Sequence, residues 1–164
     1  SVDTGTPVYL RLAREKTPVM TTEKTPFKIG KAQIVWYSGS TAVVGIIATG
    51  ALLHKALVAA KELEGKGIGV EVMNLSTIKP LDNEAIVELA KKTGRIVTVE
   101  EHQIRGGMGS AVAECLAKNF PVPMEFIGVD DLFGQSGTPD ELIEHYGMGT
   151  KSIIEAVEKI LKRK

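Results

Sequence analysis

The fold is decided by the stretch Val97-Thr98-Val99-Glu100-Glu101-His102-Gln103-Ile104-Arg105-Gly106-Gly107-Met108-Gly109-Ser110-Ala111-Val112. It begins as a β-branched strand, passes through a polar turn and continues into a helix with small side chains. Three of the four residues 106–109 are glycine, which permits positive φ and close backbone approach. Such a slim helix start either packs tightly on a sheet or holds its free N–H groups near an anion.

Strands and helices alternate on both sides of this stretch. The β-branched run 43–48 indicates a strand that is covered on both faces. The alternation predicts right-handed crossovers and a mainly parallel sheet between two helix layers, which is a three-layer α/β sandwich. Strands are expected at 43–48, 69–75, 95–99 and 124–129, with helices at 51–63, 83–92 and 109–118. Asp82 is placed to cap the second of these helices.

The two ends of the chain carry further elements. Residues 8–12 alternate apolar and polar positions and predict a strand, and a linker-like stretch with two prolines follows. Residues 27–36 predict a hairpin around Gly30 or one extended incoming strand. Near the C-terminus, Thr138-Pro139-Asp140-Glu141 is typical of a helix start, and the apolar positions of 150–164 predict a last helix.

Composition limits the class of protein. The 164 residues include 20 basic and 20 acidic side chains, so no net field attracts nucleic acid or an anionic membrane. No window reaches the ~18 apolar residues of a membrane-spanning helix. The single Cys115 lies in an apolar stretch, which predicts a buried, inert thiol and a reducing compartment, the cytoplasm. Because the chain starts without methionine and enters a strand-like run at once, we expect a piece of a longer polypeptide.

The polar residues offer several chemistries. The glycine turn lacks the third glycine of a dinucleotide fingerprint, because Val112 stands there, although Asp130 lies about 20 residues on, at the usual distance of a ribose-binding acid. Close helix–sheet packing is therefore favoured. The polar cluster Glu100-Glu101-His102 could perform acid–base catalysis or bind a divalent metal. It could instead hydrogen-bond the glycine turn or a neighbouring subunit, and this second interpretation is favoured. Trp36 and Phe133 are interpreted as packing residues.

Three motifs in order resemble the C-terminal part of transketolase and its thiamine-diphosphate-dependent relatives. They are Met73-Asn74-Leu75-Ser76-Thr77-Ile78-Lys79-Pro80-Leu81-Asp82, then Val99-Glu100-Glu101-His102 with Gly106-Gly107-Met108-Gly109-Ser110-Ala111-Val112-Ala113-Glu114, then Phe133-Gly134-Gln135-Ser136-Gly137 before Pro139-Asp140-Glu141-Leu142. The resemblance covers residues 27–164. It implies a mixed, mostly parallel five-stranded sheet in a domain that supports a homodimer and carries no catalytic, cofactor-binding or metal-binding residue.

In the complete enzyme, this resemblance implies two earlier domains that bind thiamine diphosphate, Mg²⁺ and the aminopyrimidine ring, either in the same chain or in a separate N-terminal subunit. Residues 1–26 would be the tail of the pyrimidine-binding domain and a linker, and residues 27–164 the C-terminal domain. Within Leu12-Ala13-Arg14-Glu15-Lys16-Thr17-Pro18, Arg14 takes the position of the family arginine that binds the phosphate of the sugar substrate.

The reaction implied is transfer of a two-carbon ketol unit from a ketose phosphate to an aldose phosphate. The Glu-Glu-His and Gly-Gln-Ser-Gly segments look most like the separate C-terminal section of a split transketolase. The alternative within the superfamily is the C-terminal domain of a 2-oxo acid dehydrogenase β subunit or of deoxyxylulose phosphate synthase, acting as a docking module. The isolated fragment is expected to be inactive.

Overall fold

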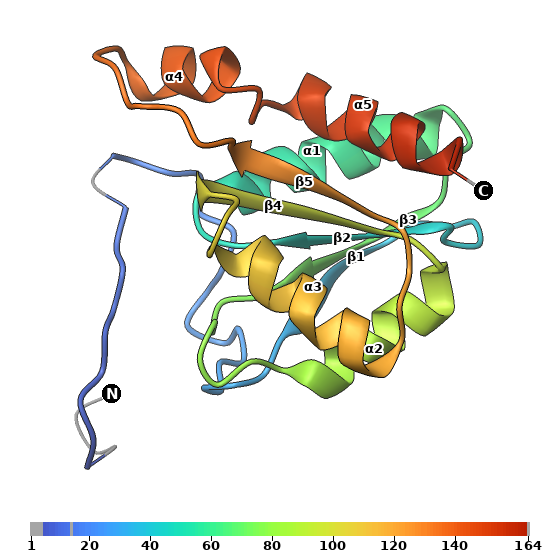
Figure 1. Ribbon diagram of the computed structural model, residues 1–164, viewed down its shortest axis with the longest axis horizontal. Coiled ribbons are helices and arrows are strands. Elements are labelled where there is room, and N and C mark those ends of the chain that lie inside the picture. Colours follow the sequence, from blue (N-terminus) through green and yellow to red (C-terminus); the bar gives the residue numbers. More distant parts are fainter. Residues whose placement is uncertain (1–4, 14, 164) are drawn as a thin grey trace.

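A five-stranded sheet with strand order β1-β3-β2-β4-β5 lies between two helix layers (Figure 1). The computed structural model describes residues 5–13 and 15–163. Its elements are β1 (Gln33–Tyr37), β2 (Val44–Ala48), α1 (Leu52–Gly65), β3 (Val70–Asn74), α2 (Asn83–Thr93), β4 (Ile96–Gln103), α3 (Met108–Asn119), β5 (Met124–Val129), α4 (Pro139–His145) and α5 (Thr150–Leu161). Strand β1 runs antiparallel to β3 and the other pairs are parallel. The α/β class and the mixed, mostly parallel sheet are confirmed.

Each face of the sheet has its own apolar core. Helices α1 and α5 cover one face and α2 and α3 cover the other (Figure 1). Strand β2, at the centre, is buried along its whole length, with Ile46 facing the α1–α5 core and Ile47 facing the α2–α3 core. This two-sided burial explains why its sequence is a continuous apolar run rather than an alternating one.

The N-terminal segment differs from the prediction. Residues 5–13 and 15–32 form no strand or helix, and Val8, Leu10 and Leu12 are exposed. The predicted strand at 8–12 is therefore wrong, because alternation alone does not make a strand when no described segment pairs with it. The hairpin is also wrong, since residues 28–31 make a single turn in which the Lys31 N–H donates to the Lys28 carbonyl over 3.0 Å.

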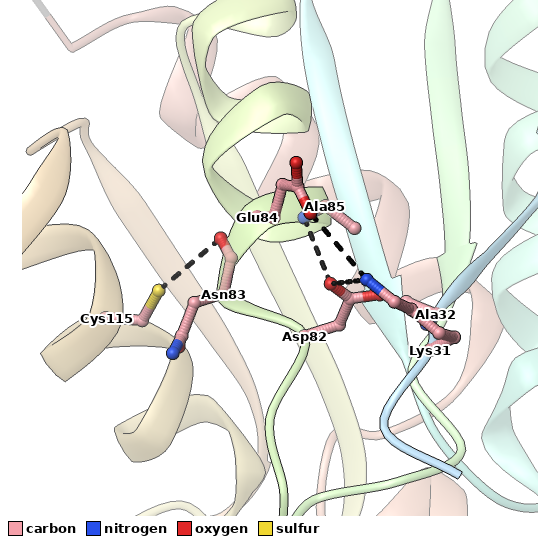
Figure 2. Close-up of polar contacts among 7 residues, drawn as sticks. All are labelled: Lys31, Ala32, Asp82, Asn83, Glu84, Ala85 and Cys115. Carbon is pink, nitrogen blue, oxygen red and sulfur yellow. Dashed lines mark hydrogen bonds and ion pairs between the residues drawn. The ribbon is translucent and has the colours of Figure 1, made fainter. Parts of the chain in front are cut away.

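Asp82 fastens this segment to the start of α2. Its carboxylate accepts hydrogen bonds from the Ala85 N–H in the first turn of the helix (3.3 Å) and from the Ala32 N–H (2.9 Å), while the Lys31 ammonium lies 3.5 Å away (Figure 2). The predicted cap is confirmed. Burial by itself would raise the pKa of Asp82, but the two backbone donors and the lysine together lower it.

We expect Asp82→Ala to lower the free energy of unfolding by about 1–2 kcal/mol. The substitution removes both the cap of α2 and the hydrogen bond to the Ala32 N–H, just before β1. Asp82→Asn, which keeps one acceptor oxygen, should cost less. The folded-state pKa is depressed, so the charged carboxylate stabilises the fold above its ordinary pKa of 3.8 and that contribution disappears as pH falls through the folded value. Urea unfolding at pH 7 and pH 3 measures both effects; an equal difference between wild type and Asp82→Ala at the two pH values would contradict the assignment.

Cys115 lies on α3 beside the same helix start. It is buried, and its thiol lies 3.9 Å from the Asn83 carbonyl oxygen (Figure 2). Burial raises the pKa of the Cys115 thiol, with smaller opposing contributions from Asn119 and Lys118. The predicted burial is confirmed, and a raised pKa leaves less of the nucleophilic thiolate at neutral pH.

Candidate functional site

The polar end of β4 and the turn before α3 are held together by one buried carboxylate. Glu100 lies within β4 and is 3% exposed, and its two carboxylate oxygens accept the backbone N–H groups of Met108 (2.6 Å) and Gly109 (2.7 Å). These N–H groups belong to the first turn of α3, where helix donors lack internal partners and a negative charge is stabilising. The anion at this helix start is therefore a side chain of the chain itself, and those two donors are not free for a phosphate.

Contact distance requires glycine at two positions of the turn, Gly107 and Gly109. A Cβ atom built on Gly107 would overlap both a Glu100 carboxylate oxygen and the Gln103 carbonyl oxygen. A Cβ atom on Gly109 would lie 2.6 Å from the Thr98 hydroxyl oxygen and 2.9 Å from the Phe126 ring. The predicted close packing of this helix on the sheet is confirmed.

The neighbours of Glu100 do not join it in a catalytic set. Glu101 and His102 are exposed, and the His102 Nδ1 atom lies 3.0 Å from the Gln103 carbonyl oxygen. Over residues 5–13 and 15–163, no group of three or more His, Cys, Asp or Glu side chains is placed to hold a metal ion. Of the three residues left open by the sequence, Glu100 hydrogen-bonds the glycine turn, as the favoured interpretation had it.

A surface hollow beside α1 and α5 does not suit a diphosphate. It measures about 500 Å³, lies between α1 and α5, and is lined mainly by four glutamates and two lysines. A surplus of carboxylates repels an anionic group. This hollow therefore does not fit thiamine diphosphate, and no chemical step is assigned to the cofactor within this domain.

The remaining candidates from the sequence are Arg14, Trp36 and Phe133. Arg14, the expected phosphate-binding residue, lies outside the described residues. Arg11 lies in the same segment, and its guanidinium donates to the Glu101 carbonyl oxygen over 3.1 Å. Trp36 packs against the α1–α5 core, as predicted. Phe133 is fully exposed, so its interpretation as a packing residue is wrong within this chain.

Gln103 is the residue that sequence reasoning missed. Its side chain donates to the Leu132 carbonyl oxygen (3.2 Å) and accepts the Asp131 N–H (3.0 Å). It thereby fixes the loop between β5 and α4 to the end of β4. No local pattern indicates partners 28 and 29 residues away, so only the strand order could have shown this role.

Residues 30–153 match the family model described as the transketolase C-terminal domain. A 6-deoxy-6-sulfo-D-fructose transketolase subunit from Clostridium sp. strain MSTE9 is 45% identical over 96% of this chain and 48% of its own length. A putative transketolase C-terminal section from Methanocaldococcus jannaschii is 39% identical over 96% of this chain and 49% of its own length. This chain thus spans about half the length of these two relatives.

A solved structure agrees with this placement. A chain described as a split gene transketolase, inactive beta4 tetramer, superposes with a TM-score of 0.84 at 40% identity, covering 90% of this chain and 48% of that one. None of the helices α1 to α5, in the part of the chain that the structure describes, combines the length and the apolar character of a membrane-spanning helix. The family match, these relatives and the strand order lead to one assignment: the chain belongs to the transketolase C-terminal domain family.

Proposed function

We propose that this chain is the C-terminal section of a transketolase that transfers a two-carbon ketol unit from a ketose phosphate to an aldose phosphate. The observation that carries the proposal is its 45% identity to half of a sulfofructose transketolase subunit. Another relative, a subunit of the apulose-4-phosphate transketolase of Phocaeicola vulgatus, is 39% identical over 99% of this chain and 51% of its own length. Both are subunits of transketolases, which supports a parent enzyme made of separate subunits.

In this proposal, residues 1–26 are the tail of the pyrimidine-binding domain and the linker, and residues 27–164 are the C-terminal domain. The earlier domains hold thiamine diphosphate and Mg²⁺, which supply the carbanion chemistry. The part of the chain that the structure describes contributes scaffold rather than reacting groups. Arg14 is proposed to hold the phosphate of the sugar, because a planar guanidinium can bond two phosphate oxygens at once.

The proposed assembly is a homodimer, in which each half combines this chain with the N-terminal transketolase domains or subunit. Its proposed location is the cytoplasm. The 40% identical split gene transketolase chain is described as a tetramer, which supports self-association of this chain. The single buried cysteine supports a reducing compartment. Sugar phosphates are the proposed substrates, and neither nucleic acid nor membrane takes part.

We expect that this chain alone does not bind thiamine diphosphate. The physical reason is that Glu100 already occupies the helix start that could have received an anion, and that the hollow between α1 and α5 is acidic. Calorimetric titration of the chain with the cofactor and magnesium should give no saturable heat. A site of micromolar affinity would contradict the division of labour between the domains.

The complete enzyme tests the function itself. Purified with this chain in place and supplied with thiamine diphosphate and Mg²⁺, it should transfer ketol units between phosphorylated sugars. Co-purification with a lipoyl-bearing partner, and no ketol transfer, would indicate the oxo-acid dehydrogenase alternative. Condensation of pyruvate with a triose phosphate would indicate the deoxyxylulose phosphate synthase alternative.

A further inference from the structure

The two edge strands of the sheet, β1 and β5, are protected to different degrees. An edge strand carries backbone N–H and C=O groups that can pair with another chain. Proteins therefore usually cover such edges or give them charged side chains. In the part of the chain that the structure describes, β5 has both kinds of protection and β1 has neither.

Strand β5 is protected by α5 and by the residues that follow it. Glu125, on β5, lies 2.7 Å from the Lys159 ammonium and 2.6 Å from the Arg163 guanidinium. The same guanidinium donates a hydrogen bond to the Met124 carbonyl oxygen over 2.8 Å. Strand β5 thus carries charged side chains, and one of its backbone acceptors already has a partner, so this edge is unsuited to pairing with another chain.

Strand β1 offers an uncharged edge. Its five residues, Gln33-Ile34-Val35-Trp36-Tyr37, include neither a charge nor a proline, and four of them are of types that favour strands. Val35 is 39% exposed and Tyr37 is 65% exposed. The Lys92 ammonium lies 5.6 Å from the centre of the Tyr37 ring, but its charge is balanced by an ion pair with Glu71. A short uncharged segment of this composition is the type that pairs with other strands.

Val35 marks the middle of this edge. Ile34 lies opposite Met73 and Trp36 lies opposite Val72, so Val35 has no partner residue in β3. It is the extra residue of a β-bulge, which is left out of the ladder and increases the local twist. The twist limits pairing to the few residues around it. If β1 pairs antiparallel with the β1 of a second copy, all five residues overlap only when Val35 lies opposite its counterpart.

We propose that the edge of β1 pairs antiparallel with the same edge of a second copy, across a two-fold axis at Val35, and joins the two five-stranded sheets into one. This inference rests on the proposed function, which includes self-association of the chain, and it names the contact. A two-fold contact uses the same surface on both partners. An uncharged strand suits such a contact, because no like charges face each other. The tetramer described for the 40% identical chain favours a second copy as the occupant.

Sedimentation of the complete enzyme tests this contact. Val35→Lys places two ammonium groups opposite each other across the axis, and like charges directly opposite are destabilising. We therefore expect the variant to have half the mass of the wild type, and to need a roughly tenfold or more higher concentration to reassociate. Val35→Thr, which stays β-branched and uncharged, should sediment as the wild type does.

A control variant places the same charge elsewhere on the molecule. Phe133 is fully exposed in the loop after β5, so Phe133→Lys should change neither the mass nor the melting temperature. If this variant halves the mass and Val35→Lys does not, copies associate through the β5–α4 loop and the inference is wrong.

Cross-linking keeps the test decisive if Val35→Lys also lowers stability. Side chains directly opposite each other on antiparallel strands have Cβ atoms about 4.5–5.5 Å apart, which is close to the separation within a disulfide. Val35→Cys should therefore form a disulfide with its counterpart under mild oxidation with copper phenanthroline, whereas Phe133→Cys should not. The native Cys115 is buried and does not compete.

An unchanged mass of Val35→Lys, or no cross-link through Val35→Cys, would overturn the inference, and a strand of another domain or subunit would remain as the occupant of this edge. Ketol transfer is assayed on the same wild-type enzyme, so the two proposals fail separately. Ketol transfer together with an unchanged mass of Val35→Lys removes only the β1 contact. A halved mass of the variant, with no ketol transfer by the wild type, removes only the proposed reaction.

Discussion

In the complete enzyme, Arg14→Ala is expected to lower kcat/KM for phosphorylated sugars roughly 10- to 100-fold, which corresponds to losing a charge-assisted contact of about 1.5–3 kcal/mol. The contact lies at the phosphate, far from the reacting carbon, so its binding energy serves the transition state as well as the ground state. Steady-state kinetics with phosphorylated and unphosphorylated donors measure the effect. Unphosphorylated donors should be affected much less.

Two further variants make the Arg14 result specific. Arg14→Lys keeps the charge but loses the planar fork, so it should recover only part of the rate. Arg11→Ala, at a nearby arginine whose described contact is a backbone carbonyl, should change kcat/KM by less than about threefold. Equal losses for both kinds of donor, or no loss for either, would reject the phosphate-binding role.

The second large effect concerns the glycine turn. Gly107→Val and Gly109→Val should each lower the free energy of unfolding by ~3 kcal/mol, the upper end of the range for overpacking a well-packed site. At Gly107 the new Cβ atom would meet Glu100 and a backbone carbonyl, and at Gly109 it would meet Thr98 and Phe126. Neither place can give way without moving α3 off β4 or breaking the bonds of Glu100.

Chemical denaturation of the chain measures this loss of stability. Gly65→Val is the matched control, because a Cβ atom there meets nothing within 4 Å, and it should change stability by no more than about 1 kcal/mol. Unchanged stability of the turn variants, with activity lost in the complete enzyme, would instead assign the turn to a ligand.

The sequence contained enough to predict the repeating part of the fold. From β2 to β5, each strand is a short apolar run and each helix has one apolar face, so local periodicity locates them to within a few residues. Strand β1 is harder to predict from the sequence, because its direction depends on pairing with β3, about 40 residues later. The strand expected at 8–12 shows the opposite case, in which the local pattern is present but no described partner completes it.

The candidate site was predictable only in part. The glycine spacing predicted close packing, because an absent side chain has a direct geometric meaning. The role of Glu100 could not be decided from the sequence, because a carboxylate next to a histidine gives the same sequence pattern whether it takes part in catalysis or accepts hydrogen bonds from backbone N–H groups. Phe133 was misassigned because the pattern of a loop does not tell whether an aromatic ring points inward or outward.

The pairing of α1 with α5 matters for how the polypeptide is made on the ribosome. Every element that contributes to the α2–α3 layer has been synthesised once residue 129 has emerged, so that half of the molecule can close early. The flank of α1 cannot, because Ile153, Val157 and Ile160 of α5 complete its core. Synthesis proceeds from the N-terminus, so the nascent chain exposes this apolar flank until α5 has left the exit tunnel. The emergence of α5, rather than that of any earlier element, therefore sets when the apolar flank of α1 is protected from aggregation.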